Sequence, residues 1–74
     1  MNGMLLFDTT HHALLAEQLA HEHGLAAEVI PAPADSKAKC DLALEYLCED
    51  EARLMNVLQA GGVQFMVYAS RRPT

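Results

Sequence analysis

The sequence predicts an α+β domain in which four strands form one antiparallel sheet and two helices cover one face of that sheet. Three observations lead to this prediction. Four short segments have the continuous or alternating apolar pattern of strands, and two longer segments have apolar residues at helical spacing. These segments follow one another as strand, helix, strand, strand, helix, strand. The chain has 74 residues, which is enough for one small domain.

The first predicted elements are a strand and a helix. Residues 4–7 form a short continuous apolar run, which is typical of a buried central strand. Thr9 or Thr10 is expected to cap the helix of about four turns that follows, because a threonine hydroxyl accepts a bond from a free N–H of the first turn. Gly24 is expected to end this helix. The positions predicted to form its apolar stripe are 14, 15, 16, 19 and 20, and Glu17 and Glu22 are predicted to face water.

Two further strands are predicted in the middle of the chain. Residues 25–30 form a short strand that ends at Pro31. Residues 41–47 alternate in polarity, which predicts a strand with one covered face. Its two faces carry Leu42, Leu44 and Tyr46 on one side and Asp41, Ala43 and Glu45 on the other.

A second helix and a fourth strand complete the domain. The acidic residues 49–51 favour a helix start, because negative charge is stabilised at a helix N-terminus. The helix is expected to end at Gly61-Gly62, and residues 63–69 are predicted to form the fourth strand. Residues 1–69 are then the domain and residues 70–74 a flexible tail. The usual packing of this order of elements in a small domain is the ferredoxin-like βαββαβ sandwich.

The composition bears on location and partners. Hydrophobic residues make up 51% of the chain, which is ample for a core. The formal charge of −5 opposes a nucleic-acid partner, because such proteins present a basic face to phosphates. We find no signal peptide and no apolar run of the ~20 residues that a membrane span needs, so we expect a cytoplasmic protein without a membrane partner.

The cysteines are predicted to be free thiols, and Cys40 is the one placed for chemistry. As a strand, residues 41–47 hold Cys40 and Cys48 roughly 25 Å apart, whereas a disulfide needs about 5.5 Å between Cα atoms. The first and third strands are antiparallel neighbours in the predicted fold, so Cys40 should lie beside the start of the first helix. A thiolate there is stabilised by the helix N-terminus, with Lys37 and Lys39 as supporting cations. Cys48 falls at the other end of the strand, on the opposite edge of the sheet from the start of the first helix.

The four histidines do not predict a metal centre. His12 and His21 are ~13 Å apart along the first helix, and the neighbouring His21 and His23 do not share a face of it. His11 is the one histidine expected near Cys40. The sequence contains no glycine-rich phosphate loop, paired-carboxylate site or serine triad. We therefore expect neither a cofactor nor an enzyme active site.

Several motifs together resemble one known family. The helix start Thr10-His11, the Pro-x-Pro loop at residues 31–33, and Cys40 with the Leu-Ala-Leu of residues 42–44 are similar to the family described as putative sulfur/selenium carrier protein-like. The resemblance runs from about residue 5 to about residue 58. It implies a protein that holds sulfur or selenium on Cys40, with Thr10 and His11 at the matching helix start.

The chain departs from this family pattern at two positions, and other functions stay open. Ala34 stands where members usually have arginine, and Asp41 where they usually have glycine. The leading hypothesis is a non-enzymatic carrier that forms a persulfide or selenenylsulfide on Cys40 and exchanges it with donor and acceptor proteins. The alternatives are a thiol redox sensor, a small protein-interaction or oligomerisation module such as a homodimer, and a metal chaperone that uses Cys40 and His11.

Overall fold

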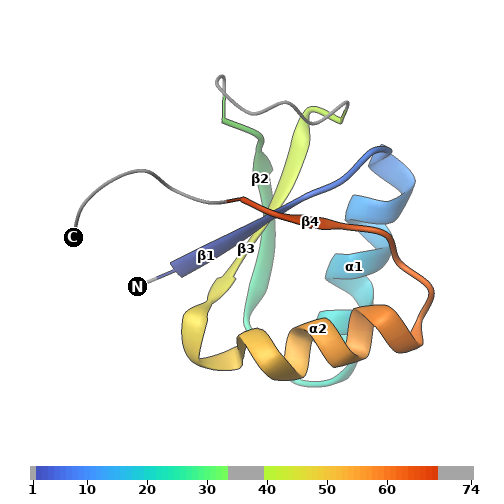
Figure 1. Cartoon of the computed structure of the whole chain (residues 1–74). Coiled ribbons are helices and arrows are strands. Elements are labelled where there is room, and N and C mark those ends of the chain that lie inside the picture. Colours follow the sequence, from blue (N-terminus) through green and yellow to red (C-terminus); the bar gives the residue numbers. More distant parts are fainter. Residues whose placement is uncertain (1, 34–39, 69–74) are drawn as a thin grey trace.

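The computed structural model describes residues 2–33 and 40–68, which form one four-stranded antiparallel sheet with two helices on one face (Figure 1). The sheet order is β2-β3-β1-β4, which is the order of a ferredoxin-like sandwich. The predicted fold class is therefore confirmed. The elements are β1 (Asn2–Leu6), α1 (Thr10–Glu22), β2 (Ala27–Pro31), β3 (Leu42–Leu47), the short 3₁₀ turn η1 (Cys48–Asp50), α2 (Glu51–Ala60) and β4 (Met66–Val67).

The two helices end in the same way, with a left-handed glycine followed by a buried apolar residue. Gly24 has φ +72 and Gly62 has φ +75, a backbone conformation that only glycine adopts without strain. The next residue then donates its N–H back into the helix, from Leu25 to the Ala20 carbonyl at 2.9 Å and from Val63 to the Leu58 carbonyl at 3.0 Å. The predicted stop at Gly24 is thus confirmed.

The fourth strand is shorter than predicted. The sequence suggested residues 63–69, whereas β4 covers Met66–Val67. Its expected first residue, Val63, is instead part of the bonded end of α2 and lies in the core. The predicted boundary between domain and tail, at residue 69, lies outside the described residues.

The buried stripe of α1 is made of small residues and differs from the prediction. Ala13, Ala16 and Ala20 are fully buried, which lets the helix axis approach the sheet closely, whereas Leu14 is 50% exposed. Leu14 was therefore wrongly placed in this stripe, to which Ala13 belongs instead. An apolar residue can lie beside the buried stripe of a helix without being part of it. Glu17 does not face water as predicted: it is half-buried, and its Oε2 accepts a hydrogen bond from the Val29 N–H at 3.1 Å.

The core lies between the sheet and the helices. Its largest fully buried side chains are Phe7, Leu5, Leu44, Leu54 and Leu58. On the opposite face of the sheet, Ala43 is also buried, in register between Leu6 of β1 and Ile30 of β2. The prediction that β3 has a single covered face is therefore too simple, because a small side chain is buried by its larger cross-strand neighbours. Neither helix of the described part of the chain has the length and hydrophobicity that a membrane crossing requires.

Candidate functional site

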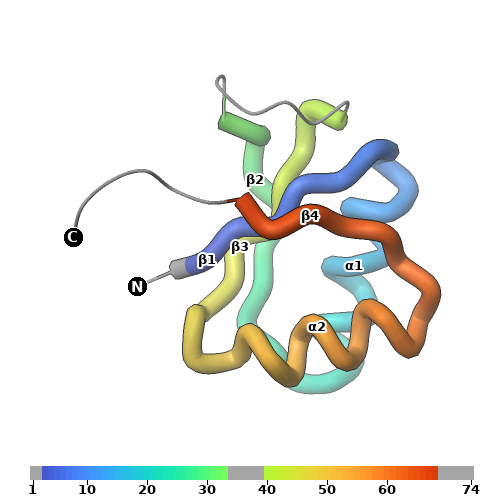
Figure 2. The backbone as a smooth tube through the Cα atoms, in the orientation of Figure 1, coloured from blue at the N-terminus to red at the C-terminus, as the bar shows by residue number. Residues whose placement is uncertain are grey.

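The candidate site lies at the end of the sheet where β1 ends and β3 begins. The two strands are antiparallel, with Leu6 opposite Ala43, so the turn after β1 lies beside the segment that precedes β3. Figure 2 shows these two segments together at one end of the molecule. The Thr10 Oγ1 is 3.6 Å from the Cys40 Sγ. The predicted meeting of the helix start with Cys40 is therefore confirmed for Thr10.

The sulfur of Cys40 has two polar neighbours. The Leu42 N–H donates to Cys40 Sγ at 3.3 Å, within the tight turn that opens β3. The Thr10 hydroxyl, from the first residue of α1, also forms a hydrogen bond with the sulfur, in which either atom can be the donor. When the sulfur is a thiolate, both groups donate to it, and hydrogen bonds to a charged acceptor are the stronger kind. Two hydrogen-bonding groups from different parts of the chain therefore meet at the Cys40 sulfur.

The first turn of α1 fixes the position of Thr10. Thr9 precedes the helix in extended conformation, and its hydroxyl accepts a hydrogen bond from the His12 N–H at 3.2 Å. This is the N-cap arrangement that satisfies one of the free N–H groups of a helix start. The Cys40 sulfur, 3.6 Å from the Thr10 hydroxyl, therefore lies beside the N-terminal end of α1.

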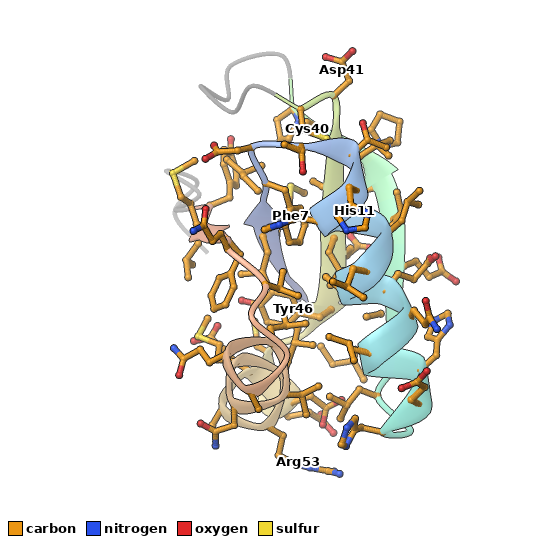
Figure 3. The ribbon with its side chains drawn as sticks, turned by 90° about the vertical axis from the view of Figure 1, so that its right-hand side faces the viewer. Phe7, His11, Cys40, Asp41, Tyr46 and Arg53 are labelled. Atoms are coloured by element: carbon orange, nitrogen blue, oxygen red, sulfur yellow. The ribbon has the colours of Figure 1, made fainter. Side chains whose placement is uncertain are left out.

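Cys40 is buried, which the sequence did not indicate. The residue is 5% exposed and belongs to the core cluster that includes Phe7. Figure 3 shows the two residues at the same end of the sheet, on the side that the helices cover. The carrier hypothesis needs a thiol that a donor can reach, whereas the residue that precedes β3 packs under the start of α1.

The neighbour of Cys40 in sequence does not crowd the sulfur. Asp41 is exposed, and its carbonyl accepts a hydrogen bond from the Ala32 N–H at 2.8 Å. Figure 3 shows its side chain directed away from Cys40 and out of the domain. The glycine-to-aspartate departure from the family pattern therefore does not place a carboxylate on the thiol.

The other predicted site residues are not gathered at the sulfur. His11 is exposed and its ring centroid is 5.8 Å from that of His12; among the described residues the hydrogen bonds of the Cys40 sulfur are to Thr10 and Leu42 and not to His11. His12 instead ties α1 to the segment before β4, since its Nδ1 accepts a hydrogen bond from the Gln64 N–H at 3.1 Å. Lys37, Lys39 and Ala34 lie outside the described residues. No signal in the sequence marks the bond between His12 and Gln64, which are 52 positions apart.

The second cysteine lies at the opposite end of β3. Cys48 is exposed and directly follows β3, and both cysteines are free as predicted. Next to it the Tyr46 hydroxyl donates to Glu51 Oε1 at 2.8 Å. Burial of the ring raises the pKa of Tyr46 well above its ordinary value, and the hydrogen bond and negative charge of Glu51 add to this effect.

The hollows of the surface do not mark the site. A hollow of about 320 Å³ lies at the Cys48 end, lined by residues such as His21, Leu25, Glu28 and Tyr46. A smaller one of about 190 Å³ is lined by Asp8, Gln64 and their neighbours. Neither is lined by a cysteine. Within the described residues, no three His, Cys, Asp or Glu side chains are grouped as a metal ion requires.

A comparison with protein families gives a match over most of the chain. The family model described as "Putative Se/S carrier protein-like" matches residues 2–68. The chain belongs to this family. The match includes the Thr10 and Cys40 positions of this Se/S carrier-like domain, and it spans all four strands and both helices. The searches of curated proteins and of solved structures returned no match.

Proposed function

We propose that this protein is a carrier that holds one sulfur or selenium atom on Cys40 and passes it from a donor protein to an acceptor protein. The observation that supports the proposal is the pair of donors on one sulfur, the Leu42 N–H and the Thr10 hydroxyl, at a helix N-terminus. Membership of the Se/S carrier-like family agrees with it.

The transfer is an exchange at sulfur that needs no external oxidant. The Cys40 thiolate attacks the outer sulfur of a donor persulfide, a new S–S bond forms at Cys40, and the old S–S bond breaks to release the donor cysteine as a thiolate. For selenium, the atom attacked is the outer selenium of a donor selenenylsulfide. The same exchange in reverse delivers the atom to the acceptor. Thr10 and Leu42 donate hydrogen bonds to the anionic Cys40 sulfur before it is loaded and again after it has delivered the atom.

The burial of Cys40 limits which donors can load it. A sulfur in a residue that is 5% exposed is reached only after a local opening of the chain around it. A dissolved low-molecular-weight donor waits for this opening, whereas a docked protein can favour it through its own contacts. We therefore expect slow loading by small persulfides and faster loading by a protein donor.

The same burial favours a second candidate, a small protein-interaction module without carrier chemistry. A free cysteine is among the residue types most often buried, where it packs as a small apolar side chain. Cys40 belongs to the core cluster, as this reading requires. The two candidates differ in whether the Cys40 sulfur reacts in the folded protein.

The deciding experiment loads each thiol separately. Cys48→Ser leaves only Cys40, and Cys40→Ser leaves only the exposed Cys48. Each variant is incubated with glutathione persulfide, freed of donor, and then mixed with an acceptor thiol, with intact mass recorded at each stage. We expect the Cys48→Ser variant to gain one sulfur slowly, keep it after the donor is removed, and lose it to the acceptor.

The control for access is the same Cys48→Ser variant in urea, where Cys40 is exposed and must load. Loading in urea together with no adduct on the folded protein, at any pH from about 6 to 9, would overturn the carrier and leave the interaction module. The Cys40→Ser variant reports how an unpositioned surface thiol behaves. An adduct on Cys48 that is retained and delivered as well as one on Cys40 would also count against a role specific to Cys40.

A further inference from the structure

The two outer strands of the sheet, β2 and β4, differ in the hydrogen bonding of their outward backbone groups. On β2, side chains of α1 bond to these groups. In an antiparallel strand alternate residues turn their backbone groups outward, and on β2 these residues are Ala27 and Val29. The His21 Nε2 donates to the Ala27 carbonyl at 2.8 Å, and Glu17 Oε2 accepts from the Val29 N–H at 3.1 Å. The last residue of the strand, Pro31, has no N–H to offer.

The spacing of α1 matches the spacing of β2. Glu17 and His21 are one helical turn apart, about 6 Å along the axis, and Ala27 and Val29 are two strand residues apart, about 6.6 Å. Side chains of the helix therefore occupy two outward backbone groups at once, the Ala27 carbonyl and the Val29 N–H. Occupied groups of this kind hinder the addition of a further strand at this edge.

The β4 edge has no such protection in the described part of the chain. The Tyr68 N–H donates to the Met4 carbonyl at 2.9 Å, so the backbone groups of Tyr68 and Met66 face β1 and those of Val67 face outward. No side chain among residues 2–33 and 40–68 hydrogen-bonds to the outward groups of Val67. β4 is the last strand in the sheet order, and Figure 1 shows it in front of β1.

The side chains of β4 suit an apolar contact. Large apolar side chains are exposed at four described positions, and two of them are on β4: Met66 is 47% exposed and Val67 52%. Residues 59–68 contain no charged side chain, although the whole chain carries −5. On the β2 side, by contrast, Glu28 and Glu45 are paired in register. A second copy of this acidic chain therefore meets less like-charge repulsion at β4 than at β2.

We propose that the β4 edge is a self-association surface, at which β4 of a second copy pairs antiparallel about a two-fold axis at Val67. Val67 then faces Val67 of the second copy, and the two residues exchange both of their outward hydrogen bonds. Met66 lies opposite Tyr68 of the second copy, a contact between a thioether and an aromatic ring. The two sheets become one continuous sheet. This inference is independent of the chemistry of Cys40.

The pairing also keeps the nearest carboxylates apart. Asp8 lines the small hollow beside Gln64 and Met66, near the start of β4. Because the paired strands run in opposite directions, the two copies of Asp8 lie at opposite ends of the contact. A contact made by one short strand buries little surface, so we expect a weak dimer with a Kd on the order of 100 μM.

The first test compares lysine substitutions at two positions of similar exposure, one on β4 and one on α1. Val67 and Leu14 are 52% and 50% exposed, but Leu14 is on α1, away from the β4 edge. Sedimentation equilibrium up to about 1 mM should show the wild type and Leu14→Lys approaching twice the mass of one chain, and Val67→Lys remaining a monomer. A monomeric wild type over the whole range, or a Val67→Lys variant that dimerises as well as Leu14→Lys, would overturn the proposal.

The second test traps the two-fold axis and does not depend on the folding of Val67→Lys. Residues of a hydrogen-bonded antiparallel pair have Cα atoms about 5.5 Å apart, which a disulfide spans. In the Cys48→Ser background, Val67→Cys should form a covalent dimer under mild oxidation, and the matched Leu14→Cys should form far less. Equal yields from the two variants would refute a contact centred on Val67. Circular dichroism of each variant checks that the fold is kept.

Discussion

The two cysteines lie at opposite ends of β3 and in opposite surroundings. Cys40 precedes the strand, is 5% exposed, and has the Leu42 N–H and the Thr10 hydroxyl at its sulfur. Cys48 follows the strand and is exposed, and within the described residues no hydrogen bond reaches its sulfur. One thiol has positioned donors without open access, and the other has access without donors. The comparison separates a placed sulfur from a merely reachable one.

The difference comes from what joins each end of β3 to the rest of the fold. At the Cys40 end the chain leaves β1 through the buried Phe7 and enters α1 at once, so the helix start covers the sulfur. At the Cys48 end the strand runs into η1, whose three residues are not buried. The order of elements therefore determines which thiol is enclosed.

The largest effect is expected from Phe7→Ala, which removes packing at the Cys40 end and should make the two thiols more alike in reactivity. Phe7 is fully buried, and truncating a buried phenylalanine costs about 3–5 kcal/mol, a large part of the stability of so small a domain. We expect the alkylation rate of Cys40 to rise toward that of Cys48, because Cys40 is exposed whenever the domain opens. Urea denaturation and mass-resolved alkylation of the two thiols measure both effects.

The control for this variant is Leu14→Ala. Leu14 is 50% exposed, so its truncation should change the free energy of unfolding by less than about 0.5 kcal/mol and leave both alkylation rates as they are. If Cys40 in Phe7→Ala stays as slow as in the wild type, its protection does not come from the packing at this end of the sheet.

Much of the fold could be predicted from the sequence, because its signals are local. Gly24 and Gly62 end helices by a backbone conformation that few other residues adopt, and Thr9 caps α1 with its own hydroxyl. The strand order then predicts which ends meet, and this brought Thr10 to Cys40. Leu14 shows the limit: an apolar residue on a helix does not reveal which neighbouring stripe faces the sheet.

The details of the site depend on tertiary contacts that the sequence does not encode locally. The burial of Cys40 follows from how closely α1 approaches the sheet, which Ala13, Ala16 and Ala20 permit only together. The outward direction of Asp41 depends on the turn that opens β3. The bonds of Glu17 and His21 to β2 could have been anticipated from their one-turn spacing only with the strand already placed beside the helix.

The next largest effect is expected from Gly3→Ala, which disturbs the Cys48 end alone. A Cβ at position 3 would lie 2.5 Å from Cζ and from the hydroxyl oxygen of Tyr46, so the ring must move. Overpacking of this kind costs about 1–3 kcal/mol. Amide chemical shifts should change around Tyr46 and Glu51 more than around Thr10, and urea denaturation gives the stability change.

The clash is tested by repeating the substitution without the ring. In a Tyr46→Val background, Gly3→Ala should cost much less than it does in the wild type, giving a clear coupling in a double-mutant cycle. Equal costs in the two backgrounds would show that Gly3 is needed for some reason other than the Tyr46 ring.

A smaller effect is expected from Thr10→Val, which removes one hydrogen-bonding group from the Cys40 sulfur and so tests whether that group matters. Valine keeps the shape of threonine and loses the hydroxyl that lies 3.6 Å from the sulfur. One hydrogen bond is worth about 0.5–1.5 kcal/mol, so sulfur loading of Cys40 in the Cys48→Ser background should slow by up to about tenfold. Thr10→Ser should restore the rate. Slow loading that serine does not restore would show that the methyl group, and not the hydroxyl, matters.

An effect of similar size at neutral pH is expected from Tyr46→Phe, at the Cys48 end, and its pH dependence identifies it. Removing the hydroxyl that donates to Glu51 costs about 0.5–1.5 kcal/mol near pH 7. Burial raises the pKa of Tyr46 above its ordinary value of 10.0, so the folded chain keeps the phenol proton at a pH where the unfolded chain releases it. The unfolded state then binds fewer protons, and the free energy of unfolding falls as the pH rises above about 10.

Tyr46→Phe has no phenol at this position to titrate, so its free energy of unfolding should fall less steeply than that of the wild type between about pH 9 and 11. Tyr68 is present in both proteins and so does not distinguish them. Urea denaturation across this range measures the two slopes. Equal slopes would mean that neither the burial of Tyr46 nor its bond to Glu51 holds the phenol proton in solution.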